Sequence, residues 1–119
     1  MFVLSAIVVS VVALLHVYFM ILEMFLWDKP IGLKVFGQSR EKAEATKVLA
    51  ANQGLYNGFI AAGLLWGLLQ GAEGTAFKVF FLSCVVVAGI FGGLTASRKI
   101  LMVQALPGLI GLLLVIFAG

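Results

Sequence analysis

Four long apolar stretches dominate the sequence and restrict what the chain can fold into. Of its 119 residues, 63% are hydrophobic and 11% are charged, whereas soluble domains are about half apolar and a quarter charged. A helix needs roughly 20 predominantly apolar residues to cross the hydrocarbon of a bilayer. The sequence meets this need over 2–27, 48–70, 76–96 and 100–118. It therefore predicts an integral membrane protein.

Each stretch is expected to be an α-helix, because backbone groups in hydrocarbon must bond within their own segment. The apolar runs are continuous and show no strict alternation, which excludes a β-barrel. No polar linker divides the chain, so we predict one domain over residues 1–119, an all-α integral membrane protein with a four-transmembrane-helix bundle. The first stretch has no positive n-region and no cleavage motif of a secretory signal, so it is expected to remain as a span.

The basic residues orient this bundle. Cytoplasmic loops carry an excess of Lys and Arg, and seven of the eight basic residues lie between the first two stretches or between the last two: Lys29, Lys34, Arg40, Lys42, Lys47, Arg98 and Lys99. Loops 28–47 and 97–99 are therefore predicted to be cytoplasmic, with the N and C termini outside. The net charge of +3 thus comes from basic residues that flank membrane segments, as expected for a protein whose partner is the lipid bilayer. No nucleic-acid partner is expected.

The long loop 28–47 has its own local signals. Pro30 and Gly37 break helices and make turns, so the start of this loop is expected to be an irregular connection along the headgroups. Ser39 is a suitable N-cap for the second helix, which would begin before the membrane. In that helix Glu44 and Lys47 are close enough to pair.

Two titratable side chains interrupt the first apolar stretch, "LLHVYFMILEMFLW". At about 100° per residue, His16 and Glu23 lie about 20° apart on one helical face. Intramembrane ionisable residues are costly and usually mark a functional site. We predict that Glu23 and His16 face the bundle interior and are the candidate catalytic acid and base.

Amide and phenol side chains of other stretches fall at a similar depth. In the second stretch, Gln53 and Asn57 are one helical turn apart, as are Asn52 and Tyr56; the fourth contributes Gln104. Counting about 1.5 Å per residue places this polar layer in the cytoplasmic half of the membrane. We expect Glu23 to face Gln53, Asn57 or Gln104. The predicted ligand-binding residues are Asn52, Gln53, Tyr56, Asn57 and Gln104.

Glycines and one proline predict how the helices pack. The pairs Gly54 with Gly58 and Gly89 with Gly93 have G-x-x-x-G spacing, which lets helix backbones approach closely. Pro107 removes a backbone hydrogen bond near Val103 and is expected to kink the fourth helix beside the polar layer.

Three segments together resemble a known family: "HVYFMILEMFLW", "NQGLYNGFIAAGL" and "QALPGLIGL". The chain resembles a family of small bacterial four-span membrane proteins catalogued as domain of unknown function 1304, over nearly its whole length. The resemblance implies a multi-pass protein of the bacterial cytoplasmic (inner) membrane and brings no activity with it.

The sequence favours one kind of function, given first here, and leaves two alternatives. The first is a polar intramembrane pocket that binds a small lipid-soluble molecule, with Glu23 and His16 as acid and base if it is an enzyme. The second is a proton-coupled transporter or channel, which would require a homo-oligomer. The third is a structural or accessory subunit in which the polar layer only joins helices. Cys84 is the only cysteine, which excludes a multi-cysteine metal site. One His with one Glu leaves a metal site short of ligands, so no metal or cofactor is expected.

Overall fold

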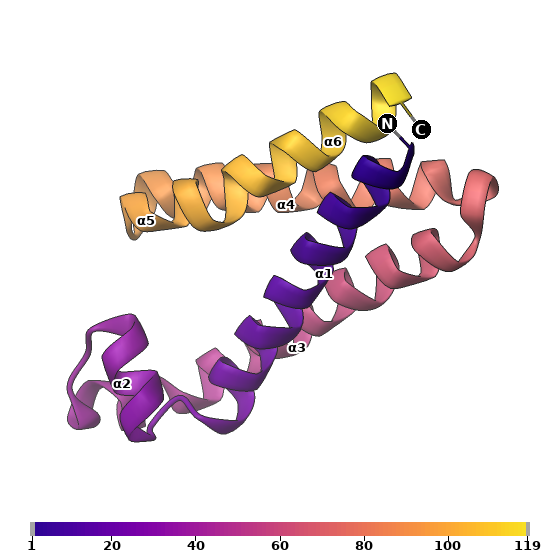
Figure 1. The fold of residues 1–119 in the computed structure, drawn as a ribbon. Helices are drawn as coiled ribbons and strands as arrows, with labels where there is room; N and C mark the ends of the chain where they lie inside the picture. The colour runs from indigo at the N-terminus through magenta and orange to yellow at the C-terminus, as the bar shows by residue number, and fades with distance from the viewer. Residues whose placement is uncertain (1, 119) are drawn as a thin grey trace. The chain divides into compact units, whose positions relative to one another are not determined.

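The structure is a computed structural model that describes residues 2–118, and in these residues all regular structure is helical, as predicted (Figure 1). The elements in chain order are α1 (Phe2–Phe25), α2 (Pro30–Phe36), α3 (Arg40–Leu69), the 3₁₀ helix η1 (Gly71–Gly74), α4 (Thr75–Thr95), α5 (Arg98–Ile100), the π-helical segment η2 (Leu101–Ala105) and α6 (Leu106–Ala118).

Three segments of the described residues are long and apolar enough to cross a membrane: Phe2–Phe25, Gly71–Thr95 and Arg98–Phe117. The remaining long helix, α3, has 30 residues and so has the length for a span. The amides of Asn52, Gln53 and Asn57 fall in its apolar part and lower its mean hydropathy. A chain with three span-capable helices is thus confirmed, and the fourth span stays a prediction.

The chain forms two compact units by its internal contacts. One unit joins Met1–Leu14 with Ile60–Gly119, and the other is Leu15–Phe59. The boundaries fall inside α1 and α3, so each of these helices contributes to both units. The first is the larger unit and the second is the smaller unit.

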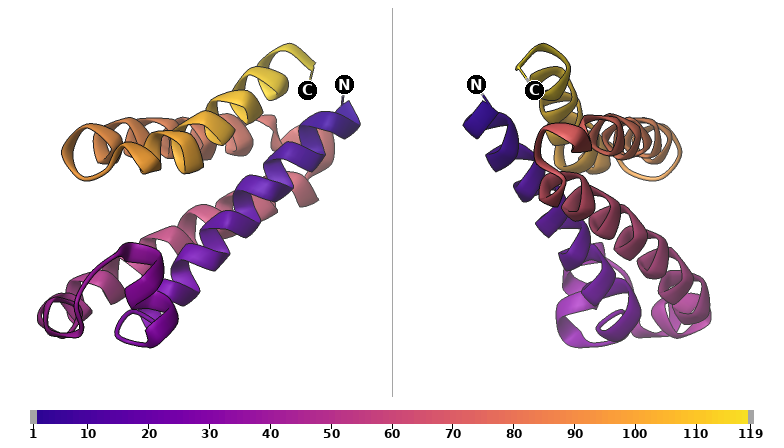
Figure 2. Two further views of the ribbon diagram at one scale, coloured as in Figure 1. Left: turned by 60° about the vertical axis from the view of Figure 1, so that its left-hand side comes forward. Right: turned by 90° about the vertical axis from the view of Figure 1, so that its right-hand side faces the viewer.

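A cluster of buried aliphatic side chains forms the core of the larger unit: Val9, Val12, Ala13, Leu64, Leu82, Val85 and Val115. These side chains are at most 1% exposed. In the same unit α6 runs beside α4, as the views in Figure 2 show.

Glycines set the register between α4 and the last part of the chain. A Cβ added at Gly89 would lie 2.6 Å from the backbone nitrogen of Ala105, closer than real Cβ contacts. Further along, Gly108 faces Val85 and Gly111 faces Leu82. Contacts whose residue numbers rise on one helix as they fall on the other describe an antiparallel pair. The G-x-x-x-G spacing at Gly89 is therefore used inside the chain.

The last helical run changes its winding before Pro107. Residues Leu101–Ala105 form a π-helical segment, in which backbone hydrogen bonds join residues five apart instead of the four of an α-helix, so that each turn is wider. Proline lacks an N–H and its ring collides with the carbonyl four residues earlier, and the wider turn lies directly before it. The predicted irregularity beside Gln104 is thus a π-helical segment.

The smaller unit, Leu15–Phe59, packs the end of α1 against the beginning of α3. Gly54 lies against Glu23 and Met24, and Gly58 lies against Met20. These contacts make the two segments antiparallel, which can be followed in Figure 1. Glycine on α3 lets the long Met20 side chain fill the space that a Cβ would need.

The connection between α1 and α3 contains a helix that was not predicted. Pro30 begins α2, and Gly37 ends it with φ of 60°. Proline suits the first helical turn, where its missing N–H costs nothing, and glycine suits the left-handed position after the last turn. Two residues that we interpreted as turn formers are here the two ends of α2. The predicted N-cap is confirmed, since Ser39 Oγ accepts a hydrogen bond of 3.1 Å from the backbone N–H of Lys42.

The close approach at Gly89 can be tested by adding one methyl group. Overpacking a tight contact costs about 1–3 kcal/mol, so Gly89→Ala is expected to lower the free energy of unfolding by about that amount in bicelles. The control is Gly111→Ala, because a Cβ there meets only side-chain atoms, the nearest 3.3 Å away. Equal effects of the two variants would contradict the assigned contact between Gly89 and the Ala105 backbone.

Candidate functional site

Glu23 and His16 are both buried on α1. The side chain of Glu23 is 9% exposed and that of His16 is 1% exposed. The His16 ring packs edge-on against Phe19, with ring centroids 5.5 Å apart. The two titratable residues therefore point away from the exposed side of the helix, as their shared helical face predicts.

Glu23 has an amide partner on α3. Asn57 Nδ2 donates a hydrogen bond of 2.5 Å to Glu23 Oε1. Of the three amides expected near this carboxyl group, Asn57 is the one that bonds to it. The carboxyl group of an apolar helix is thus given a donor from a distant segment, which offsets part of the cost of its burial.

A hollow of about 400 Å³ lies beside Glu23 within the smaller unit. Its lining combines polar and apolar side chains: Glu23, Trp27, Gln38, Lys42, Thr46, Leu49, Ala50 and Gln53. The predicted residue Gln53 therefore shares this hollow with Glu23. Such a size is near the lower end of small-molecule sites, which measure about 300–1,000 Å³.

The hollow offers hydrogen-bonding groups that the chain itself does not use. The buried Nε2 of Gln38 has no hydrogen-bond partner among residues 2–118. Lys42 adds an exposed ammonium group, and Glu23 adds a carboxyl oxygen. A molecule in this hollow could meet donors and an acceptor together.

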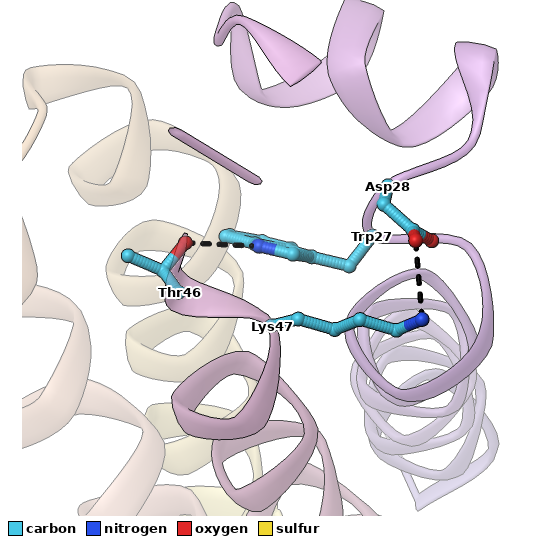
Figure 3. Close-up of polar contacts among 4 residues, drawn as sticks. All are labelled: Trp27, Asp28, Thr46 and Lys47. Atoms are coloured by element: carbon cyan, nitrogen blue, oxygen red, sulfur yellow. Dashed lines mark hydrogen bonds and ion pairs between the residues drawn. The ribbon is translucent and has the colours of Figure 1, made fainter. Parts of the chain in front are cut away.

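Two contacts join the chain that follows α1 to α3 beside the hollow (Figure 3). Trp27 Nε1 donates to Thr46 Oγ1 at 3.1 Å, and Lys47 Nζ donates to Asp28 Oδ2 at 3.1 Å. Lys47 thus pairs with Asp28, and the expected partner Glu44 was wrong. The Lys47 ammonium holds the pKa of the Asp28 carboxyl group below its ordinary value.

The other predicted binding residues lie elsewhere. Asn52 and Tyr56 are exposed and do not line the hollow, and the Tyr56 ring packs edge-on against Phe59. Gln104 belongs to the larger unit, where its Nε2 donates to the backbone carbonyl of Val85 at 3.4 Å. A ligand-binding role for these three residues stays a prediction.

Helical spacing could have identified further lining residues. Lys42 and Thr46 precede Gln53 by eleven and seven residues, which places all three near one face of an α-helix. The predicted binding residues of this helix all lie in its apolar part, so Lys42 and Thr46 were not among them. Trp27 follows Glu23 by four residues, about one helical turn, and lines the same hollow.

The burial of Lys78 was also not predicted from the sequence. It lies in the first turn of α4, yet its side chain is only 2% exposed. Its ammonium group lies 5.7 Å from the centre of the Phe2 ring, and its stem lies against Gly67. A cation over an aromatic face is attracted by the ring quadrupole.

Among residues 2–118, no group of three His, Cys, Asp or Glu residues could hold a metal ion.

Comparison with known proteins places the chain in a family. A family model described as "Protein of unknown function (DUF1304)" matches residues 10–116. The chain belongs to this family. It is also similar to the "Uncharacterized protein YpaA" of Lactococcus lactis subsp. lactis (strain IL1403), with 31% identity over 106 residues that cover 87% of this chain and 89% of the relative. No solved structure matches the chain. The resemblance drawn from the sequence is thus confirmed.

The bond between Asn57 and Glu23 predicts an energetic coupling between the two side chains. Interhelical hydrogen bonds in membranes contribute about 0.6 and at most about 2 kcal/mol. A double-mutant cycle with Glu23→Gln and Asn57→Leu, measured by unfolding in bicelles, is expected to give about 1 kcal/mol. The matched cycle pairs Glu23→Gln with Asn52→Leu and is expected to give no coupling, because Asn52 is exposed. Equal coupling in both cycles would contradict the bond.

The ion pair between Asp28 and Lys47 predicts a pH dependence. A lowered pKa in the folded state means that the pair contributes stability above the ordinary pKa of Asp and loses it as the pH falls through the lowered value. In an NMR titration the Asp28 midpoint is expected to lie below about 3.9 and to rise in Lys47→Met. Lys34→Met is the control and should leave the midpoint unchanged. An unchanged midpoint in Lys47→Met would refute the assignment.

Proposed function

We propose that this protein crosses the bacterial inner membrane four times, with α3 as one span, and that the hollow beside Glu23 binds a small amphiphilic molecule from the cytoplasmic leaflet. The observation that supports this most is the position of Glu23. It is a buried carboxyl group on a span-capable helix that has one amide donor and also borders the hollow.

A purely structural use of Glu23 would be served by a closed polar layer. Gln38 also lines the hollow, and its buried Nε2 has no hydrogen-bond partner among the described residues. Buried polar groups are normally bonded, so a donor of this kind favours a ligand that carries an acceptor. This argues for a binding site and against a contact that only joins helices.

The lining suggests the class of ligand. Trp27, Leu49 and Ala50 supply apolar surface, while Lys42 and Gln38 supply donors. Small-molecule sites commonly combine an apolar wall with a few polar groups that fix orientation. An acceptor or anionic group on the ligand would meet Lys42 and Gln38. A hydroxyl or amine on the same molecule would meet Glu23.

The membrane location has separate support. Three segments of the described chain have the length and apolar composition of spans, and seven basic residues flank these segments on the side of loops 28–47 and 97–99. In this arrangement the beginning of α3 emerges into the cytoplasm, which leaves the hollow open toward the inner leaflet and the cytoplasmic headgroups.

Mass spectrometry of the purified protein in lipid nanodiscs can test the binding site. The wild type is expected to retain a small molecule, and Glu23→Gln is expected to retain about tenfold less, since losing a charged hydrogen-bond partner costs about 1.5–3 kcal/mol. Gln53→Leu should show a smaller loss. Glu44→Gln changes an exposed carboxyl group outside the hollow and serves as the control.

The same experiment can refute the proposal. If wild type and Glu23→Gln retain the same molecules in equal amounts, or if neither retains any beyond bulk lipid, the hollow is not a binding site. A joining role for Glu23 would then be the remaining interpretation, and it would appear as a loss of stability in Glu23→Gln without any change in retained molecules.

A further inference from the structure

One line of exposed side chains on α3 has a spacing that is typical of helix–helix contacts. Within the smaller unit, Val48, Asn52, Leu55 and Phe59 follow one another at intervals of four, three and four residues. Alternating steps of three and four keep side chains in one narrow row along a helix. We call these four residues the α3 seam.

The whole seam is exposed. Val48 is 83% exposed, Leu55 is 42% exposed and Phe59 is 54% exposed, and Asn52 is also exposed. No side-chain hydrogen bond from Asn52 is found among residues 2–118. The residues of α3 that face α1, such as Gly54 and Asn57, lie on another side of the helix.

Asn52 is the feature that requires a partner. It lies five residues beyond Lys47, the last charged residue of α3, and so about 7.5 Å further along the helix. An asparagine side chain is too short to reach back over that distance to water. Hydrocarbon offers no hydrogen bonds, so an exposed amide at this depth is costly unless another polar group bonds to it.

We propose that the α3 seam is the interface of a parallel homodimer in which Asn52 bonds to Asn52 of a second copy. All copies of a membrane protein insert with the same orientation, so a two-fold axis along the membrane normal brings equal depths together. A carboxamide has both donors and an acceptor and is therefore complementary to itself. A single Asn in an otherwise apolar seam also specifies the register of paired helices.

Asn52, and not the apolar rest of the seam, favours a second copy over lipid alone. Val48, Leu55 and Phe59 contribute contacts that lipid chains could equally provide, so they supply shape and little specificity. Asn52 supplies an interaction that lipid cannot. Tyr56 flanks the seam with its ring against Phe59.

Cysteine crosslinking can test this interface, because Cys84 is the sole cysteine and Cys84→Ser provides a clean background. Val48→Cys and Leu55→Cys, reconstituted in vesicles and oxidised, are expected to form disulfide-linked dimers. The control is Leu49→Cys. Leu49 is 73% exposed on the described surface, but it lies about 90° away from the centre of the seam and lines the hollow.

Asn52→Leu added to Leu55→Cys is expected to reduce the crosslinked fraction at least fivefold, because it removes the self-complementary amide and retains an apolar seam. Crosslinking of Leu55→Cys no stronger than that of Leu49→Cys would overturn the proposal. A crosslinked fraction unchanged by Asn52→Leu would also overturn it.

The inference rests on the proposed membrane location of α3 and is independent of any ligand in the hollow. A charged maleimide separates the two failures in vesicles permeable to it. Labelling of Leu55→Cys would show that α3 lies in water and would refute the membrane location as well. Protection from labelling together with absent crosslinks would refute the α3 seam alone.

Discussion

The hydrogen bond from Asn57 to Glu23 is the contact on which the smaller unit depends, because it joins a costly group on one helix to a donor on another. A charged side chain in the centre of a bilayer costs about 2.5–3.5 kcal/mol on insertion scales. The amide of Asn57 offsets part of this cost only when α1 and α3 have the correct rotation and axial position. Gly54 and Gly58 permit that position, since a Cβ at either residue would collide with α1 side chains.

The hollow follows from this pairing. Beyond Glu23, α1 ends at Phe25 while α3 extends back to Arg40, so the first turns of α3 lie beside the chain that leaves α1. Trp27 and Asp28 of that chain bond to Thr46 and Lys47, and the space between these contacts and Glu23 is lined by both polar and apolar groups. A binding site at this position would contact the polar end of a molecule near the headgroups and its apolar part deeper in the membrane.

The larger unit is built on a different principle. Its core is aliphatic, and α4 approaches η2 at Gly89 and approaches α6 at Gly108 and Gly111, with few polar contacts. Gln104 bonds a backbone carbonyl of α4, and Lys78 lies over an aromatic ring. Close backbone approach gains dispersion contacts that lipid cannot replace as well, which is how small residues favour helix association in a membrane.

The sequence by itself determined the helical class, the apolar segments and the common face of His16 and Glu23, since these depend on composition and on the local period of an α-helix. It also indicated the cap at Ser39 and the irregular winding before Pro107, because both arise within a few residues. The prediction of an irregular connection at Pro30 and Gly37 was less reliable. Proline and glycine are favoured both in turns and at the ends of a short helix, so local signals did not distinguish a turn from α2.

Only the tertiary structure decided which amide reaches Glu23. The sequence allowed Gln53, Asn57 or Gln104. The axial position of α3 against Met20 selected Asn57 for the bond and Gln53 for the hollow. The same setting turned Asn52 outward and brought Lys47 to Asp28, a residue nineteen positions away. The physical reason is that the rotation and register of two packed helices depend on side chains distant in sequence, which a local pattern does not contain.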